Sequence, residues 1–205
     1  MTNSADIPSP LQRVRALGLA NKAWFNAIWF QTTWFICVLG REPWVPAALA
    51  MIAIHFALVA NPRRELVALA PIIATGVIVD ASLSRTGVFD FGGELVPLWL
   101  CLLWVAFATT LSRAMAPLGK YRWLTVLIGG IGVPFNYAVG AKMGAVALPL
   151  EPWITAVTLV SIWAILLPVL FVMSGVYPTK RQILTAGATF KTVNPLPKTD
   201  DSGSP

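Results

Sequence analysis

Long apolar runs separated by short polar connections make up most of the chain. A helix that crosses the hydrocarbon core of a bilayer, about 30 Å thick, needs about 20 mostly apolar residues. Runs of this length with few charged residues occur six times. The pattern therefore predicts six transmembrane helices, which cover residues 21–40, 44–60, 66–84, 95–115, 121–143 and 153–174.

The composition agrees with lipid as the main solvent of the chain. Of the 205 residues, 57% are hydrophobic and 12% are charged, and the mean hydropathy is +0.71. These values lie outside the range of soluble domains. We predict an all-α, polytopic membrane protein with a cytoplasmic leader (1–20), a six-helix transmembrane domain (21–174) and a disordered cytoplasmic tail (175–205). The leader fits either an unstructured segment or a short basic helix on the membrane surface.

The basic residues predict the orientation. All of the 15 Lys and Arg residues except Arg41, Arg85 and Lys142 fall in four segments: the leader, the connections after the second and fourth predicted helices, and the tail. Cytoplasmic loops carry the excess of Lys and Arg, so both termini are expected in the cytoplasm. Because these residues do not cluster on one face, the net charge of +6 reflects topology, and no nucleic-acid partner is expected.

The second, fourth and sixth predicted helices begin in a similar way. Proline suits the first helical turn, an acidic group favours the positive end of the helix dipole, and Trp favours the membrane interface. Convergence can explain each of these choices, but the near-constant spacing favours three helix hairpins arranged as a parallel repeat. The three starts are Glu42-Pro43-Trp44, Glu94 through Pro97 to Trp99, and Glu151-Pro152-Trp153.

Asp80 is the first candidate for a functional residue, because it follows a long apolar run. A carboxylate inside a membrane span is costly and needs a partner, water or a proton. Arg85 lies little more than one turn further on, and Lys142 lies at a comparable level of the fifth predicted helix. A structural ion pair with one of these cations is the favoured interpretation, and a ligand or proton site is the alternative.

His55 is the only histidine of the chain and lies within the second predicted helix. Folding the first two predicted helices back on each other places Gln31 at nearly the same depth, which predicts a hydrogen bond between the two side chains. This structural interpretation is favoured over a proton relay or a ligand site. A lone histidine argues against a zinc site built by the protein, and no metal is expected.

The fifth predicted helix carries small and polar residues at four-residue steps: Gly132, Asn136, Gly140 and Gly144. Small residues let another helix approach closely, so tight packing is the favoured interpretation and a cleft is the alternative. Pro134 removes a backbone hydrogen bond and is expected to kink this helix near Tyr137.

Several other polar or reactive residues fit less specific interpretations. Asn26, Asp80 and Asn136 are almost evenly spaced, which adds Asn26 to the candidate residues. The nine Trp residues are interpreted as interface anchors and packing residues. Cys37 and Cys101 are interpreted as packing residues, with a disulfide between them as the less favoured alternative. The common metal, nucleophile-elbow and nucleotide-binding motifs are absent, so catalytic residues stay unknown and no cofactor is expected.

Several short motifs together resemble a known family; they cover residues 25–27, 30–31, 34–35, 80–87, 97–100, 107–111 and 136–144. With these motifs the chain resembles a bacterial inner-membrane family, domain of unknown function 2878. Two positions differ from the usual pattern: Ser112-Arg113 replaces Asn-His, and Phe135-Asn136 replaces Leu-Ser. No role of that histidine therefore carries over to this chain. Genes of the family often lie beside genes for lipid-modifying methyltransferases, which implies envelope lipid metabolism.

Three classes of function stay open from the sequence. The leading hypothesis is a binding or transport protein for a lipid-like or small apolar ligand, with a site near Asp80, Asn136, Tyr137, Gln31 and His55. The main alternative is an accessory protein that holds a lipid-modifying enzyme at the membrane through its basic loops. An intramembrane enzyme that uses Asp80 or His55 is the third. The lipid bilayer is the expected partner, and self-association through the glycine stripe would give a homo-oligomer.

Overall fold

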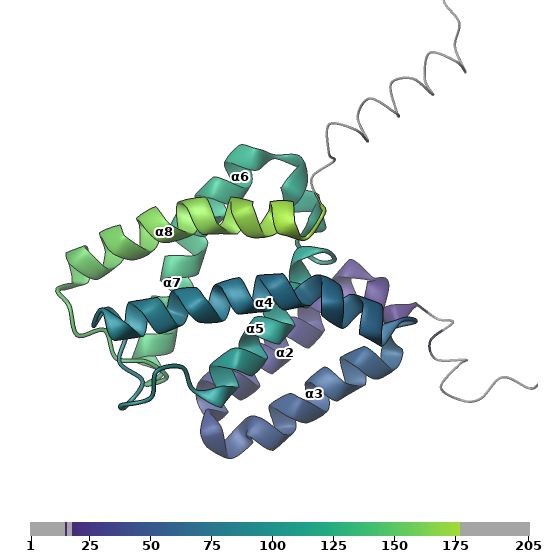
Figure 1. The fold of residues 1–205 in the computed structure, drawn as a ribbon, viewed down its shortest axis with the longest axis horizontal. Helices are drawn as coiled ribbons and strands as arrows, with labels where there is room; N and C mark the ends of the chain where they lie inside the picture. Colours follow the sequence, from purple (N-terminus) through teal and green to yellow (C-terminus); the bar gives the residue numbers. More distant parts are fainter. Residues whose placement is uncertain (1–14, 16–17, 177–205) are drawn as a thin grey trace, which may run out of the picture.

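The computed structural model describes residue 15 and residues 18–176, which are helical apart from short connections and two isolated β-bridges (Figure 1). Most of the predicted leader and nearly all of the predicted tail lie outside the described residues. The α-helices are α2 (Ala23–Gly40), α3 (Val45–Leu58), α4 (Pro62–Arg85), α5 (Leu98–Leu111), α6 (Arg122–Leu127), α7 (Val133–Lys142) and α8 (Pro152–Met173). The shorter helices are η1 (Leu19–Asn21), η2 (Glu42–Trp44), η3 (Ala116–Lys120) and the π-helical η4 (Ile128–Gly132).

Within the described residues, three helical stretches are long and apolar enough to cross a membrane. These are α4, the continuous stretch Arg122–Lys142 that joins α6, η4 and α7, and α8. The helix α2 has a suitable length but carries Asn, Gln and Thr residues, while α3 and α5 are shorter apolar helices. The prediction of an all-α chain with six helical segments is thus confirmed, and three of the segments are candidate membrane spans.

The helix starts agree with the repeated Glu-Pro-Trp pattern. Pro43 and Pro152 occupy the first positions of η2 and α8, where a missing N–H is tolerated, and Pro97 is the N-terminal cap of α5. Glu42 also acts across helices, because its carboxylate accepts a 2.9 Å hydrogen bond from the backbone N–H of Leu98. The acidic residue at the start of α3 therefore holds the start of α5 beside it.

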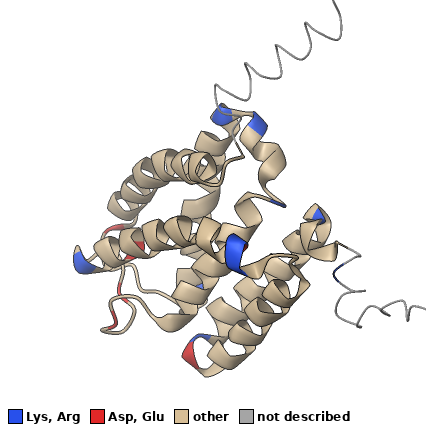
Figure 2. Cartoon of the chain, turned by 45° about the vertical axis from the view of Figure 1, so that its right-hand side comes forward, with Lys and Arg blue, Asp and Glu red and all other residues tan. Residues whose placement is uncertain are grey.

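The connections gather at two ends of the helical bundle. At the first, which we call the loop end, Arg41 donates to the carbonyl of Gly144 at 2.8 Å, and Asp90 pairs with Ala147 in a β-bridge. At the second, which we call the arginine end, η1 and the start of α4 lie beside the last residues of α3, α5 and α8. Successive helices thus run in alternating directions, and the helical domain begins and ends at the arginine end. Figure 2 shows that charged residues concentrate at helix ends and connections.

Two glycines allow the closest approach of helices. A Cβ at Gly76 of α4 would collide with the ring of Trp104 in α5, and a Cβ at Gly129 would collide with the backbone carbonyl of Trp163 in α8. Both glycines are buried. They bring α4 against α5, and η4 against α8. The indole rings of Trp104 in α5 and Trp163 in α8 also stack, with centroids 5.7 Å apart.

Candidate functional site

An apolar cavity of about 290 Å³ lies between α2, α5, α7 and α8. Its wall is made mostly of aromatic and aliphatic side chains, among them Phe30 and Trp34 of α2, Phe107 of α5 and Trp163 of α8. Asn136 of α7 is the one exposed residue of this lining in the described part of the chain. The cavity therefore opens to the surface beside Asn136.

The helix α7 turns its small residues toward this cavity. Gly132, Asn136 and Gly140 all line it, and a Cβ at the buried Gly140 would have no heavy atom within 4 Å. At these three positions the favoured packing face is wrong, because the residues line a cavity, whereas Gly144 lies outside it near Arg41. The close contact with α8 is made one turn earlier, by Gly129, so the stripe is left facing open space.

A π-helical turn precedes α7 and is consistent with the expected effect of Pro134. The wider turn of η4 ends at Gly132, two residues before the proline. The side-chain amide of Asn136 donates to the carbonyl of Gly132 at 2.9 Å, and both residues line the cavity. Such turns often occur at functional sites.

Asp80 lies directly behind the cavity wall and is 0% exposed. One carboxylate oxygen accepts a hydrogen bond from the Trp104 indole N–H and the other accepts one from the Tyr137 hydroxyl, both at 2.7 Å. The favoured ion pair is wrong, because among the described residues neither Arg85 nor Lys142 forms a salt bridge with this carboxylate. Neutral donors on two cavity-lining residues replace the predicted cation.

The donors of Asp80 belong to a cluster of aromatic rings. Tyr137 stacks on Phe89 with centroids 4.8 Å apart, and Trp104 stacks on Trp163 with the ring planes 6° apart. Trp29, Trp99, Trp104 and Trp163 are all buried, in agreement with the packing role predicted for part of the Trp residues. The rings of Trp99, Trp104 and Trp163 line the cavity, and Asp80 holds the Trp104 indole from behind.

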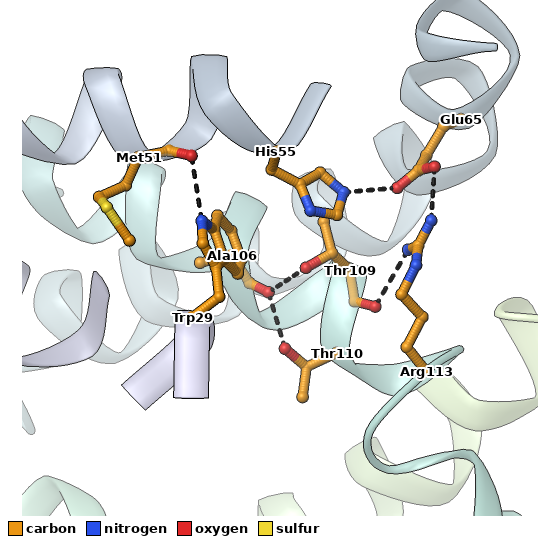
Figure 3. A network of polar contacts seen from close by, with 8 residues as sticks. All are labelled: Trp29, Met51, His55, Glu65, Ala106, Thr109, Thr110 and Arg113. Atoms are coloured by element: carbon orange, nitrogen blue, oxygen red, sulfur yellow. Dashed lines mark hydrogen bonds and ion pairs between the residues drawn. The ribbon is translucent and has the colours of Figure 1, made fainter. Parts of the chain in front are cut away.

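A second polar group, shown in Figure 3, lies nearer the arginine end. His55 Nε2 lies 2.8 Å from one carboxylate oxygen of Glu65, and Arg113 donates to the other at 2.6 Å. The predicted bond between Gln31 and His55 is wrong, because Gln31 is exposed. Trp29 occupies that position: its ring lies 4.9 Å from the ring of His55, and its indole N–H donates to the carbonyl of Met51 at 3.1 Å.

Sequence reasoning missed Glu65 and Arg113 as a pair. Both side chains are largely buried, with 11% and 12% of their surface exposed. Glu65 occupies the first turn of the apolar α4, and Arg113 stands at one of the positions that differ from the family pattern. Two features of the sequence could have indicated this ion pair: the unusual Arg113 near the end of one predicted helix, and the carboxylate of Glu65 at the start of another.

The remaining candidate residues are separated from both groups. Asn26 is 1% exposed, and neither atom of its side-chain amide has a hydrogen-bond partner among the described residues. It does not line the apolar cavity. Cys37 and Cys101 are both free, so the alternative of a disulfide is wrong.

The fold and the cavity define an all-helical protein with membrane-length helices around an apolar internal site. The family model DUF2878, described as a protein of unknown function, matches residues 23–169, and the chain belongs to this family. The match includes all the helices that line the cavity. Comparison with curated proteins and with solved structures finds no match.

Proposed function

We propose that this protein is a multi-pass membrane protein that binds a lipid-like or small apolar ligand in the cavity between α2, α5, α7 and α8. The observation that carries the proposal is open space directly against the buried Gly140, in a cavity lined almost wholly by apolar side chains. Ligand sites are concave and mostly apolar with few polar groups, and the volume of about 290 Å³ suits a small molecule or a stretch of acyl chain.

Membrane embedding by six helices, with both termini in the cytoplasm of a bacterium, is part of this proposal. Three membrane-length helices and the alternating helix directions support it. The arginine end carries Arg64 and Arg113, in agreement with the excess of Lys and Arg in cytoplasmic loops. Under this topology three parallel hairpins span the inner membrane, and the cavity mouth beside Asn136 opens laterally toward lipid.

The ligand class follows from the physics of the bilayer. An apolar molecule gains little hydrophobic free energy by moving from lipid into a protein, so binding there depends on packing contacts. The side chains around an unfilled cavity lack such contacts on one side. A flexible chain that enters beside Asn136 would supply them, and a role in envelope lipid metabolism is the context in which we place this binding.

Lipid that co-purifies with the full-length protein tests the proposal. We expect a bound lipid or small apolar molecule in the wild type and at least about tenfold less in Gly140→Leu, since about 1.4 kcal/mol of lost packing is sufficient for that change. Ala138→Leu is the matched control, because Ala138 lies exposed on the same helix and does not line the cavity. Equal amounts in wild type and both variants, measured by mass spectrometry, would contradict the proposed site.

A further inference from the structure

A second cavity, of about 400 Å³, lies at the arginine end and shares no lining residue with the apolar cavity. It differs in chemistry, because polar and charged side chains contribute much of its wall. Five helices meet there: α4 begins beside it, α3, α5 and α8 end beside it, and η1 completes the wall. Polar side chains in its wall include those of Asn61, Arg64, Ser112, Arg113 and Ser174.

The charge of this second cavity is positive. Arg113 and Glu65 both line it and neutralise each other through their ion pair. Arg64 also lines it, is exposed, and has no carboxylate partner within the described residues. One positive charge is therefore left over, and an anion is the ligand that would balance it.

Hydrogen-bond donors in this cavity are also left over. Arg113 uses its two terminal nitrogens to donate to Glu65 and to the carbonyl of Thr109, and its Nε–H, which is buried behind the wall, has no partner among the described residues. A guanidinium carries more N–H groups than these contacts use. The α4 N-terminus adds the backbone N–H groups of Arg63 and Arg64, because no side chain caps it, Pro62 has no N–H, and the N–H of Glu65 donates to the carbonyl of Asn61.

The depth of the cavity matches the level of lipid headgroups. It lies where α4 begins and α8 ends, and both helices are candidate membrane spans. Ends of spanning helices lie in the interfacial region of the bilayer, where phosphate groups are found. This step rests on the membrane embedding proposed above, but not on the apolar ligand.

We propose that the cavity at the arginine end binds a phosphate group, held by Arg64, the free N–H groups at the start of α4 and the hydroxyl of Ser112. Arginine and a helix N-terminus together form a common phosphate site. The phosphate belongs either to a phospholipid headgroup or to a free phosphate from the cytoplasm. In both cases a phosphate group with one or two negative charges would accept hydrogen bonds from the same donors through its oxygens.

Titration of the purified full-length protein in an uncharged detergent tests this site. The probes are inorganic phosphate, with chloride at equal ionic strength as its control, and short-chain phosphatidic acid, with the matching diacylglycerol as its control. The readout is the rise of the unfolding temperature with probe concentration, which gives an apparent Kd. Because Arg64 is exposed and has no ion-pair partner in the described region, Arg64→Gln is expected to fold normally.

We expect Arg64→Gln to weaken binding about tenfold, as for the loss of one charge-assisted hydrogen bond. Arg63→Gln removes the same charge from the neighbouring exposed residue, which does not line the cavity, and is expected to change the Kd by no more than about twofold. Stabilisation by phosphatidic acid alone identifies a headgroup site, and stabilisation by both probes identifies a site open to free phosphate. No stabilisation by either probe, or equal weakening by the two variants, overturns the proposal.

Gly140→Leu separates this proposal from the apolar ligand site. Gly140 does not line the cavity at the arginine end, so phosphate binding is expected to persist in this variant. A variant that loses co-purified lipid but keeps its phosphate affinity would show two independent sites. Loss of phosphate binding in Gly140→Leu would overturn the assignment to the arginine end.

Discussion

At the scale of single residues, the burial of Asp80 is the feature that most needs explanation. A carboxyl group with 0% exposure among apolar helices is costly unless both oxygens are satisfied. The Trp104 indole and the Tyr137 hydroxyl satisfy them from two different helices. Asp80 therefore fixes the inner wall of the cavity from behind, and under the proposed function its contribution to ligand binding would be indirect.

Tyr137→Phe tests this structural role. The substitution leaves one oxygen of Asp80 buried without a partner, so we expect the free energy of unfolding to fall by about 1–3 kcal/mol. Tyr121→Phe is the control, because the Tyr121 side chain is 57% exposed, and we expect a change below about 0.5 kcal/mol. Reversible unfolding in mixed detergent micelles measures both, and equal effects would contradict the account of Asp80.

The sequence indicated Asp80 and Tyr137 as candidates but not their partner Trp104. Counting residues from a turn estimates the depth of a side chain along a helix, because the rise per residue is constant. It does not determine the rotation of one helix against another. Gln31 and Trp29 show the difference: they lie close in depth, but two residues correspond to about 200° around the helix. Only Trp29 faces His55.

At the scale of helices, the glycines divide into two kinds that a sequence does not distinguish. Gly76 and Gly129 lie where a neighbouring helix touches the backbone, whereas Gly140 faces open space. All three lie inside apolar helical segments, so the pattern of small residues predicts close packing for each of them. The difference arises because η4 meets α8 one turn before the stripe of α7, and this depends on how the helices cross.

Alanine substitutions at Gly76 and Gly140 are expected to change the free energy of unfolding in opposite directions. Gly140→Ala adds a methyl group in open space and removes a flexible helical glycine, so the free energy of unfolding should rise by about 0.5–1 kcal/mol. Gly76→Ala forces the Trp104 ring away from α4, so the free energy of unfolding should fall by about 1–3 kcal/mol. Thermal unfolding in detergent compares the two variants with wild type. A loss of stability in both would show that α7 is packed rather than open.

At the scale of the whole molecule, much of the fold was predictable from the sequence. The six helical segments, the similar starts of three of them with Glu, Pro and Trp, and the family follow from local patterns. The cavity does not, because it depends on four helices that meet without filling the space between them. The ion pair between Glu65 and Arg113 joins residues 48 positions apart and depends on the same long-range packing.

The proposed topology predicts on which side each end of the bundle lies. An alkaline phosphatase fused after Gly92 at the loop end should be active, since this enzyme requires the oxidising periplasm. A fusion after Lys120, which follows α5 on the arginine side, should be inactive although expressed at a similar level. Activities of these two fusions in intact cells measure the orientation. The reverse pattern would place the loop end in the cytoplasm.

The central claim, an apolar ligand inside the helical bundle, is tested most directly by a photoreactive lipid in the native membrane. A diazirine in its acyl chain should attach to cavity residues such as Trp34 and Val146, and also to lipid-facing residues such as Trp123 and Phe135, which are 66% and 67% exposed. In Gly140→Leu the cavity adducts should disappear while the lipid-facing adducts stay. Adducts confined to the lipid-facing residues in both proteins would contradict the account.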